Sequence, residues 1–495
     1  MKAGWRGLLI CVAVAITVRA AAFRFSLNHY GDSPIRVELA ERWAAHPHLL
    51  EAWSDVYQFG PLHIYALGAA LTIWPDRDLA TRGLSLVFGV LGVAALYLLV
   101  RRREGDTAAT VAATALALHG LHIQASVSAA SEAVFLAFLL FAIDRLFAAS
   151  DAKAPATCAL HAATAGLLLS AAEATRYDGL LYALVCCLMA AAWWRRGKLA
   201  LAPLSLFVVC AAAFPLYWIG RGTAAMALDE INKAHASLAS GTIASIGRPL
   251  YAAFCVFYWP ALFALSVAPL LAIFSLIGIG DALGKRERLE LALLAWAPAI
   301  YMTMRGAVLQ DFRPLARFTM VASALSLAYA WRGFQRLTPR WRHAAIGIAF
   351  GLALLVPTTL AIVSFDRNGA VAEWARPLSP LSTVPPGIAQ AAQWIRDHHD
   401  DHDVLLVDGV WDYLDIPLAF YAGIPEERLV RRAWTNFEMR LRQNPPTLVA
   451  AIYQGELRDK TPGVHIDEEV AIVRGQRYRA VAHFVYATIY RLETR

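Results

Sequence analysis

Apolar runs dominate this sequence, and each is long enough, or nearly so, to cross a lipid bilayer. A transmembrane helix needs about 20 mostly apolar residues. Such runs occur at residues 7–25, 82–100, 107–123, 131–148, 157–175, 177–194, 199–219, 249–278, 289–304, 315–331 and 343–364. Since 58% of the residues are hydrophobic and only 17% are charged, an ordinary soluble enzyme is excluded. The runs predict a mainly α, polytopic membrane helix bundle of about 11 spans, with the lipid bilayer as its surroundings.

The basic residues predict how the spans are oriented. Lys and Arg gather in short clusters between apolar runs, as at Arg101–Arg103, and such clusters favour the cytosolic side. Their alternation holds only if the short stretch 57–74 does not span, so we expect an interfacial or re-entrant helix there. The chain is then a multi-pass plasma (inner) membrane protein with a cytosolic N-terminus and an extracytoplasmic C-terminus. Orientation also accounts for the net charge of +7, so nucleic acid is not expected as a partner.

The first apolar segment has two readings. Lys2 and Arg6 precede it, and Ala20–Ala22 resembles a signal-peptidase site, so it is either a cleaved signal or an uncleaved first span. Both readings place residue 30 outside. The six cysteines lie in apolar segments without C-x-x-C spacing, so neither a disulfide framework nor a cysteine metal site is expected.

The pattern changes near residue 366, beyond which charges recur every few residues and no run is long enough to span. Gly387–His399 has apolar residues at helical spacing, and three later segments have the composition of strands: 404–407, 448–453 and 481–492. We expect two domains, a transmembrane catalytic domain at 1–365 and a small soluble extracytoplasmic α/β domain at 366–495. The histidine-rich tract His398–His402 is predicted to be a solvated connector rather than a metal site.

The first outer loop carries the most informative acidic residue. Asp32 precedes a predicted amphipathic helix, Ile35–Ala45, with Glu38 and Glu41 along one side. Ionisable groups at helix ends that face a bundle interior are costly and usually functional. The alternative is that Asp32 only caps the helix, because Asp is a favoured N-cap residue and Pro34 suits the first turn.

Two further outer turns add charged groups. Glu132 begins the span 131–148, where its only effect could be to favour the helix dipole. Arg176, Tyr177 and Asp178 occupy a tight junction between two spans, where an Arg–Asp pair could do no more than close a helical hairpin.

Later outer loops supply more arginines. Arg305, Arg313 and Arg317 share one loop and suit an anionic ligand, because Arg binds phosphate bidentately. Anchoring to lipid headgroups would use the same residues. The long loop 220–248 could contact an acceptor through Asp229, Glu230, Lys233 and His235. Carboxylates with arginines at one membrane face predict a site that deprotonates one substrate and neutralises a phosphate on another.

The motifs follow one another in a fixed order on one side of the membrane. They are Asp32, Trp43 at the end of the amphipathic helix, Gly60-Pro61-Leu62, Ser131-Glu132, Arg176-Tyr177-Asp178-Gly179 and Arg313-Pro314-Leu315-Ala316-Arg317-Phe318. This order resembles the GT-C glycosyltransferases of the protein mannosyltransferase and aminoarabinose transferase type, which use polyprenyl-phosphate sugars. The similarity covers about residues 5–365 and extends in layout to the soluble tail.

The resemblance implies an inverting hexosyl- or pentosyltransferase that moves a sugar from a polyprenyl-phosphate donor to an extracytoplasmic glycan, lipid or protein. It implies Asp32 as general base and Glu132 as a second acidic residue that positions the acceptor or tunes Asp32. Where the family often has another acid directly after the first, this chain has Ser33. Substrate contacts are expected from Glu38, Glu41, Tyr57, His63, Arg176, Tyr177, Arg305, Arg313 and Arg317, with the last two at the phosphate. No cofactor is certain, and a divalent metal is not expected, because the first loop has no D-x-D motif.

Two other functions stay open at this point. A polytopic transporter or lipid-linked sugar flippase would also have many apolar spans. Against it, the charged groups gather at the outer ends of the spans, and the two halves of the sequence do not repeat. An assembly or scaffold protein of the envelope would need no site, and only the constellation of Asp32, Glu132 and the arginines argues against that reading.

Overall fold

The computed structural model describes residues 2–52, 54–56, 58–364, 378–409, 414–432, 436–452, 455, 457 and 461–493. The chain divides into two compact units, 1–382 and 383–495, and each is described here by itself. The boundary predicted from the sequence, between residues 365 and 366, lies outside the described residues.

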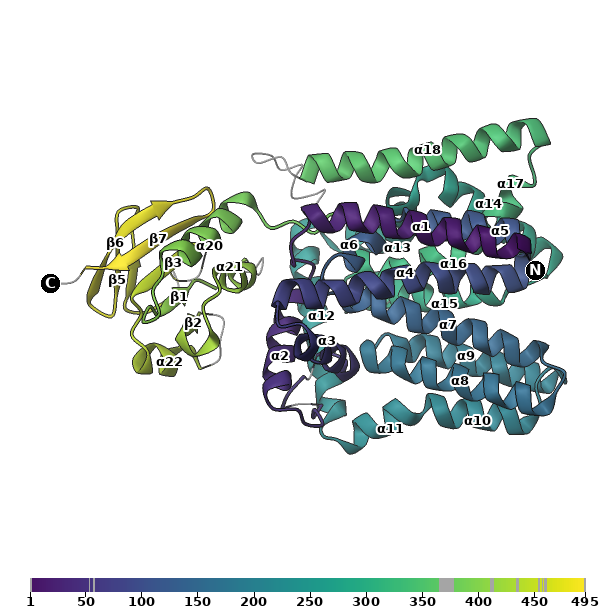
Figure 1. Ribbon diagram of the computed structural model, residues 1–495, viewed down its shortest axis with the longest axis horizontal. Coiled ribbons are helices and arrows are strands. Elements are labelled where there is room, and N and C mark those ends of the chain that lie inside the picture. Colours follow the sequence, from purple (N-terminus) through teal and green to yellow (C-terminus); the bar gives the residue numbers. More distant parts are fainter. Residues whose placement is uncertain are drawn as a thin grey trace. The chain divides into compact units, whose positions relative to one another are not determined.

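Eight helices in the described part of the first unit are long and apolar enough to cross a membrane, and each coincides with a predicted span. They are α1 (Lys2–Phe25), α4 (Arg77–Glu104), α7 (Ser131–Asp151), α8 (Pro155–Thr175), α10 with α11 (Leu201–Ala211 and Ala213–Gly220), α13 (Arg248–Val267), α15 with η1 (Glu290–Met304 and Arg305–Leu309) and α18 (Pro339–Ser364). Figure 1 shows them running side by side. Their outward surfaces stay apolar, as helices surrounded by lipid require; Leu9, Val209 and Ile362 are 64%, 67% and 68% exposed. The chain is a multi-pass membrane protein with the predicted helical fold.

The remaining predicted spans are helical but short or interrupted. Residues 177–194 correspond to α9 (Gly179–Arg195), which has 17 residues. Residues 107–123 form α5 (Asp106–Ala117) and α6 (Gly120–Ser126), and 315–331 form η2 (Ala316–Phe318), α16 (Thr319–Ser326), η3 (Leu327–Tyr329) and α17 (Ala330–Phe334). The run 249–278 continues past α13 into α14 (Pro269–Lys285), with a break at Ala268, whose φ is 133°. An apolar run does not reveal such breaks, because both halves keep the same composition.

A buried arginine stabilises the break between α5 and α6. Arg19 of α1 is fully buried, and its guanidinium donates to the carbonyl oxygen of Ala117 at 3.1 Å and to Ser126 Oγ at 3.2 Å. It also lies 2.8 Å from His122 Nδ1. Ala117 is the last residue of α5, so its carbonyl has no partner further along that helix. The guanidinium therefore replaces backbone hydrogen bonds that the break removes.

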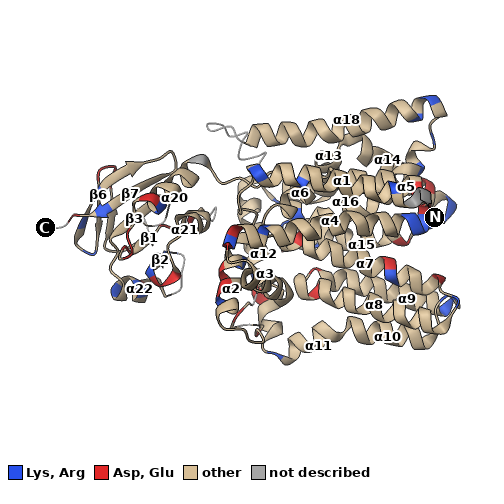
Figure 2. Ribbon diagram, viewed as in Figure 1, with Lys and Arg blue, Asp and Glu red and all other residues tan. Residues whose placement is uncertain are grey.

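Three further helices lie at the end of the first unit opposite the N-terminus: α2 (Ser33–Ala45), α3 (Pro61–Ile73) and α12 (Ala224–Ile246) (Figure 1). With 13 residues, α3 rises only about 20 Å, too little to cross a bilayer. The loop predicted at 220–248 is largely helical instead, because its many alanines favour a helix once one face can pack. Figure 2 shows Lys and Arg gathered at the other end of the unit, where the N-terminus lies.

The second unit is the predicted small α/β domain. Its strands are β1 (Leu405–Val407), β2 (Leu429–Arg431), β3 (Leu448–Ile452), β4 (Val464–Ile466), β5 (Val470–Val473), β6 (Gln476–His483) and β7 (Ala487–Leu492). They form one sheet in the order β2-β1-β3-β7-β6-β5-β4, in which β1 pairs parallel with β2 and β3, and the remaining pairs are antiparallel. The helical elements are α20 (Pro386–His398), α21 (Asp415–Ala422), η5 (Glu426–Arg428) and α22 (Phe437–Gln443). Four apolar residues at helical spacing in α20 are fully buried: Ile388, Ala391, Ala392 and Ile395.

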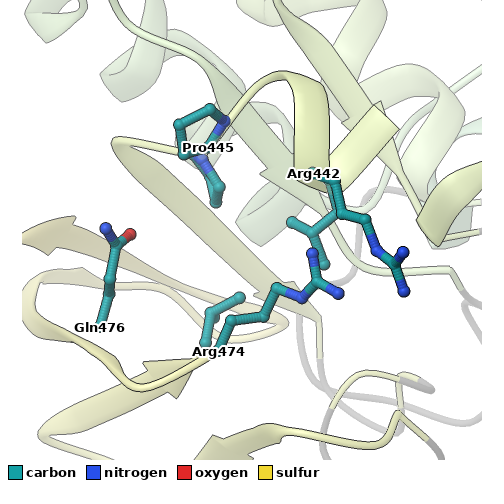
Figure 3. A pocket seen from close by; sticks show the side chains of 7 residues that line it. Arg442, Pro445, Arg474 and Gln476 are labelled. Carbon is teal, nitrogen blue, oxygen red and sulfur yellow. The ribbon is translucent and has the colours of Figure 1, made fainter. Parts of the chain in front are cut away.

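This second unit has a surface pocket of about 240 Å³ beside the turn between β5 and β6 (Figure 3). Arg442 and Arg474 contribute side chains to it. Arg474 has a φ of 52° and Gly475 a φ of 81°, the backbone of a tight hairpin turn that favours Asn-Gly. An arginine in the first position is strained there. The residues predicted from the sequence to form the functional site all belong to the first unit.

Candidate functional site

Asp32 lies directly before α2 and faces an arginine 285 residues away in the sequence, with Asp32 Oδ2 3.4 Å from Arg317 Nη1. The carboxylate makes no capping bond to α2, so the structure does not support the simple capping alternative. Burial alone would raise the pKa of Asp32, but the positive charges of Arg317, Arg36 and Arg176 together hold that pKa below its usual value. The carboxyl group of Asp32 is therefore ionised at neutral pH. Its side chain is 31% exposed, so the carboxylate is also accessible.

Glu132 and Arg176 extend this charge cluster. Glu132 is 5% exposed at the start of α7 and forms an ion pair with Arg176, which also pairs with Asp178 at 2.9 Å. Arg317 Nε lies 3.9 Å from Glu132 Oε1, so Arg317 stands between the two acidic residues. The hairpin-closing Arg–Asp pair is therefore present, but Arg176 also reaches Glu132. Ion pairs of Arg176 and Arg317 join four separate segments of the chain into one network, those of Asp32, Glu132, Asp178 and Arg317.

The backbone that precedes Glu132 is held by buried polar side chains. Asn28 Oδ1 accepts a hydrogen bond from a backbone N–H of segment 127–130 at 2.8 Å. Arg82 Nε and Ser85 Oγ donate to carbonyl oxygens of the same segment at 2.7 and 3.4 Å. These contacts tie the segment to the end of α1 and to α4, and so position Glu132 relative to Asp32.

Arg36 is a further arginine of the site, which the sequence analysis did not select. It is 6% exposed, and its guanidinium carbon lies 4.2 Å from the ring centroid of Phe59. Its Nη1 has no hydrogen-bond partner in the described part of the chain. Since Arg36 follows Asp32 by four residues on α2, helical spacing alone would have placed both on one face.

Two more buried polar groups face the same cluster. The hydroxyl of Tyr30 is buried without a hydrogen-bond partner among the described residues, and burial and the charge of Glu132 raise the pKa of Tyr30. His63 of α3 is fully buried, and neither ring nitrogen has a partner within the described ranges. Burial, followed by the positive charges of Arg36 and Arg176, lowers the pKa of His63. This predicted residue therefore lies beside the arginines of the site.

The loop after α15 holds the other two predicted arginines. Arg305 forms an ion pair with Asp311 at 3.1 Å and donates to Asn232 Oδ1 of α12 at 3.0 Å. Arg313 is half-buried, forms no ion pair among the described residues, and has a buried Nε without a hydrogen-bond partner there. Its charge acts on Tyr258 of α13. Within the described residues, Arg305 pairs with a carboxylate and Arg313 does not, so the guanidinium of Arg313 is available to a ligand.

His235 of α12 also reaches the site. Its ring centroid lies 4.7 Å from that of Phe312 and 5.9 Å from that of Phe318. Burial, followed by the charges of Arg317 and Arg305, lowers the pKa of His235 to about 4. The imidazole is therefore neutral at physiological pH.

Three predicted residues, Glu38, Glu41 and Tyr177, contribute less directly to the site. Glu41 pairs with Arg77, an arginine that the sequence analysis did not select, at 3.0 Å, and Glu38 is half-buried on the same helix. Tyr177 donates its hydroxyl to the carbonyl oxygen of Phe59 at 3.2 Å. Tyr57 lies outside the described residues. No group of His, Cys, Asp and Glu within the described ranges is arranged to hold a metal ion.

An apolar groove of about 200 Å³ lies between α13 and α15. Its lining residues are Val256, Trp259, Pro260, Trp296, Ala299, Ile300, Thr303 and Met304. Trp259 is 4% exposed and belongs to the same buried cluster as Phe312 and Phe318, the rings beneath the arginines. The groove therefore borders the arginine loop.

Comparison with known proteins identifies the fold. No protein-family model and no curated protein matches the sequence. The structure is similar to that of ArnT from Cupriavidus metallidurans in the apo state, with a TM-score of 0.66 and 14% identity over 99% of this chain and 98% of that chain. ArnT bound to undecaprenyl phosphate gives a TM-score of 0.64 at 15% identity over the same shares of the two chains. The oligosaccharyltransferase of Archaeoglobus fulgidus gives 0.56 at 15% identity over 90% of this chain and 68% of that chain. Both neighbours are GT-C proteins, and the chain has the GT-C fold that its motif order predicted.

Proposed function

We propose that this chain is an inverting glycosyltransferase that moves a sugar from a polyprenyl-phosphate donor to an extracytoplasmic acceptor. The observation that carries the proposal is the accessible, ionised carboxylate of Asp32 beside a cluster of buried and half-buried arginines. A base next to cationic groups is what attack on a phosphate-linked sugar needs. Two structural neighbours support the donor class, because they were solved with undecaprenyl phosphate and with a dolichol-phosphate.

In the proposed reaction, Asp32 accepts the proton of an acceptor hydroxyl or amine while the acceptor atom attacks the anomeric carbon of the sugar. The bond from that carbon to the phosphate oxygen breaks, and the lipid phosphate leaves with the bonding electrons. Arg313 offers an uncommitted guanidinium to this phosphate, with Arg305 behind it. Arg317 stands next to both acidic residues, where it keeps Asp32 ionised and orients it.

The apolar groove between α13 and α15 suits the polyprenyl chain of the donor. It is lined by apolar and aromatic side chains, and Trp259 connects it to the rings beneath the arginines. A chain lying there would present its phosphate to the loop of Arg305 and Arg313. We also propose an inner-membrane location with a cytosolic N-terminus, because the basic residues gather at that end of the helical unit (Figure 2).

The test is transfer of a labelled sugar from polyprenyl phosphate by reconstituted protein, comparing wild type with Asp32→Asn and Glu132→Gln. Loss of the base is expected to reduce transfer by about 10²–10⁴-fold. Asp151→Asn serves as the matched control, because Asp151 is 44% exposed and pairs with Arg103 in another part of the bundle. Full activity of Asp32→Asn would disprove the base assignment. Movement of the lipid across the bilayer by wild type, without any sugar transfer, would favour a flippase instead.

A further inference from the structure

The surface pocket of the second unit, beside the turn between β5 and β6, brings two arginines together. Arg442 and Arg474 line this cavity of about 240 Å³, and a guanidinium group can only donate hydrogen bonds. Figure 3 shows the side chain of Arg474 extending toward that of Arg442, with Gln476 on the opposite side of the pocket. The other lining residues are apolar: Leu441, Pro445, Pro446 and Val473. The lining therefore suits a ligand group that accepts hydrogen bonds.

A buried tyrosine ties two walls of this pocket together. Tyr478 is fully buried, and its hydroxyl donates to the carbonyl oxygen of Pro446 at 2.8 Å and to Gln476 Oε1 at 3.1 Å. Because the amide oxygen of Gln476 accepts this bond, its NH2 group is the end that can donate to a ligand. In the turn, the backbone N–H of Arg474 donates to the carbonyl oxygen of Gly463 at 2.8 Å. These bonds form the pocket without a ligand.

The backbone of Arg474 adopts a conformation that costs an arginine free energy. Its φ is 52° in a hairpin turn that Asn-Gly would form with less strain. Non-glycine residues at such φ values are found preferentially at functional sites, where the surrounding structure maintains the strain. At this turn the strained residue is also one that carries a guanidinium group to the pocket. The strain therefore favours a role for the side chain of Arg474.

The charges around the pocket leave one arginine without a carboxylate. Arg474 Nη2 lies 3.6 Å from Glu438 Oε2, and the two side chains are 37% and 56% exposed, so this ion pair contributes little. Two neighbouring arginines are paired at 3.4 and 3.6 Å: Arg477 with Glu493, and Arg440 with Glu426. Arg442 is exposed on α22 and forms no ion pair with any residue that the structure describes. An anion in the pocket can therefore pair with Arg442 and compete with Glu438 for Arg474.

We propose that this pocket binds one acidic sugar unit, whose carboxylate or phosphate group lies between Arg442 and Arg474. Both kinds of anion accept paired hydrogen bonds from a guanidinium group. The amide of Gln476 can donate to a sugar hydroxyl, and Pro445 and Pro446 offer apolar surface to the ring. The cavity is smaller than the roughly 300–1,000 Å³ of pockets that enclose a whole ligand, so it fits one unit of a longer chain. The choice of a sugar rests on the glycosyl transfer proposed above, whereas the choice of an anion rests on the pocket alone.

The experiment measures binding of small molecules to the full chain by ligand-observed NMR, in nanodiscs of phosphatidylcholine, which carries no net charge. The probes are glucuronate, glucose 6-phosphate, glucose and inorganic phosphate. We expect both acidic sugars to bind roughly tenfold more tightly than glucose, and more tightly than inorganic phosphate. Glucose binding as tightly as glucuronate would overturn the choice of an anion. Inorganic phosphate binding as tightly as glucose 6-phosphate would overturn the choice of a sugar.

Variants of the pocket test where the acidic sugars bind. Arg442→Gln and Arg474→Asn should each weaken their binding roughly tenfold, and Glu438→Gln should strengthen it by removing a competing carboxylate. Arg477→Gln is the matched control, because it removes the same charge from β6 at a residue that does not line the pocket. Since Arg474→Asn relieves the strained turn, weaker binding at undiminished thermal stability separates ligand contact from a structural role. Unchanged binding by Arg442→Gln, or an equal loss in Arg477→Gln, would contradict the assignment.

This site and the proposed function can fail separately, because binding is measured without glycosyl transfer. If the wild type transfers sugar but binds neither glucuronate nor glucose 6-phosphate, the pocket assignment alone is wrong. If it binds both acidic sugars through Arg442 but transfers none from any polyprenyl phosphate, the pocket assignment stands and the proposed function is wrong.

Discussion

Replacing Arg317 by Gln should raise the pKa of Asp32 and make the reaction sensitive to mild acid. Arg317 Nη1 lies 3.4 Å from Asp32 Oδ2, and the charge of Arg317 is the strongest of those that oppose the effect of burial on this carboxyl. Without that charge, burial is opposed only by Arg36 and Arg176. The carboxyl should then take up a proton at a higher pH than in the wild type.

The magnitude follows from the distance. A pair of unit charges 3.4 Å apart interacts with about 1 kcal/mol in water and about 5 kcal/mol at an effective dielectric constant of 20. Because the Asp32 side chain is 31% exposed, solvent screening favours the lower part of this range. We expect a loss of about 1–3 kcal/mol, which corresponds to a rise of about 1–2 units in the pKa of Asp32.

The assay is the pH dependence of kcat/KM for sugar transfer. In the proposed reaction Asp32 acts only as the carboxylate, so a higher pKa of Asp32 removes the base form at a higher pH. The wild type should keep its activity from pH 8 to 5, whereas the acid limb of Arg317→Gln should lie about 1–2 pH units above that of the wild type. Arg305→Gln is the matched control, because Arg305 pairs with Asp311; it should lower activity without moving the acid limb. Coincident acid limbs for Arg317→Gln and wild type would refute the reasoning.

Three further changes test the packing. Arg19→Leu should destabilise the helical unit by about 2–4 kcal/mol, because Ala117 and Ser126 lose their buried partner; an unchanged thermal midpoint in detergent would contradict this. Gly333→Ala should also lower that midpoint, since its Cβ would lie 1.9 Å from the carbonyl oxygen of Phe274, and normal stability would mean that α14 and α17 can separate. Arg474→Asn should stabilise the C-terminal unit by about 1 kcal/mol in denaturant unfolding, because Asn tolerates positive φ; a loss of stability would show that the arginine itself contributes.

The sequence could predict that the site residues lie at the same end of the helix bundle. Charge clusters between spans assign each loop to one end of the bundle, so Asp32, Glu132, Arg176 and Arg317 were expected near one another, and they form one network. Which arginine pairs with which carboxylate depends on side-chain directions that no local pattern specifies. Glu41 shows this, because it pairs with Arg77 rather than with the cluster.

The interrupted helices and helix α12 were harder to predict for a different reason. Arg19 is distant in sequence from the break that it stabilises, so residues 107–123 still have the composition of one continuous span. The region of α12 has few large apolar residues and was taken as a loop, because its packing relies on alanines. Arg36 was within reach of the sequence, since it lies one helical turn after Asp32.

The ion pair between Asp32 and Arg317 also sets a time at which the site can first exist. A ribosome adds about 5–20 residues per second, so the 285 residues between the two take about 15–60 seconds to synthesise. Until then the carboxylate lacks the strongest of the three positive charges that hold its pKa down, that of Arg317. A chain released before residue 317 can insert its early helices and still lack this ion pair. The complete charge cluster therefore forms late in translation, after most of the membrane unit has been made.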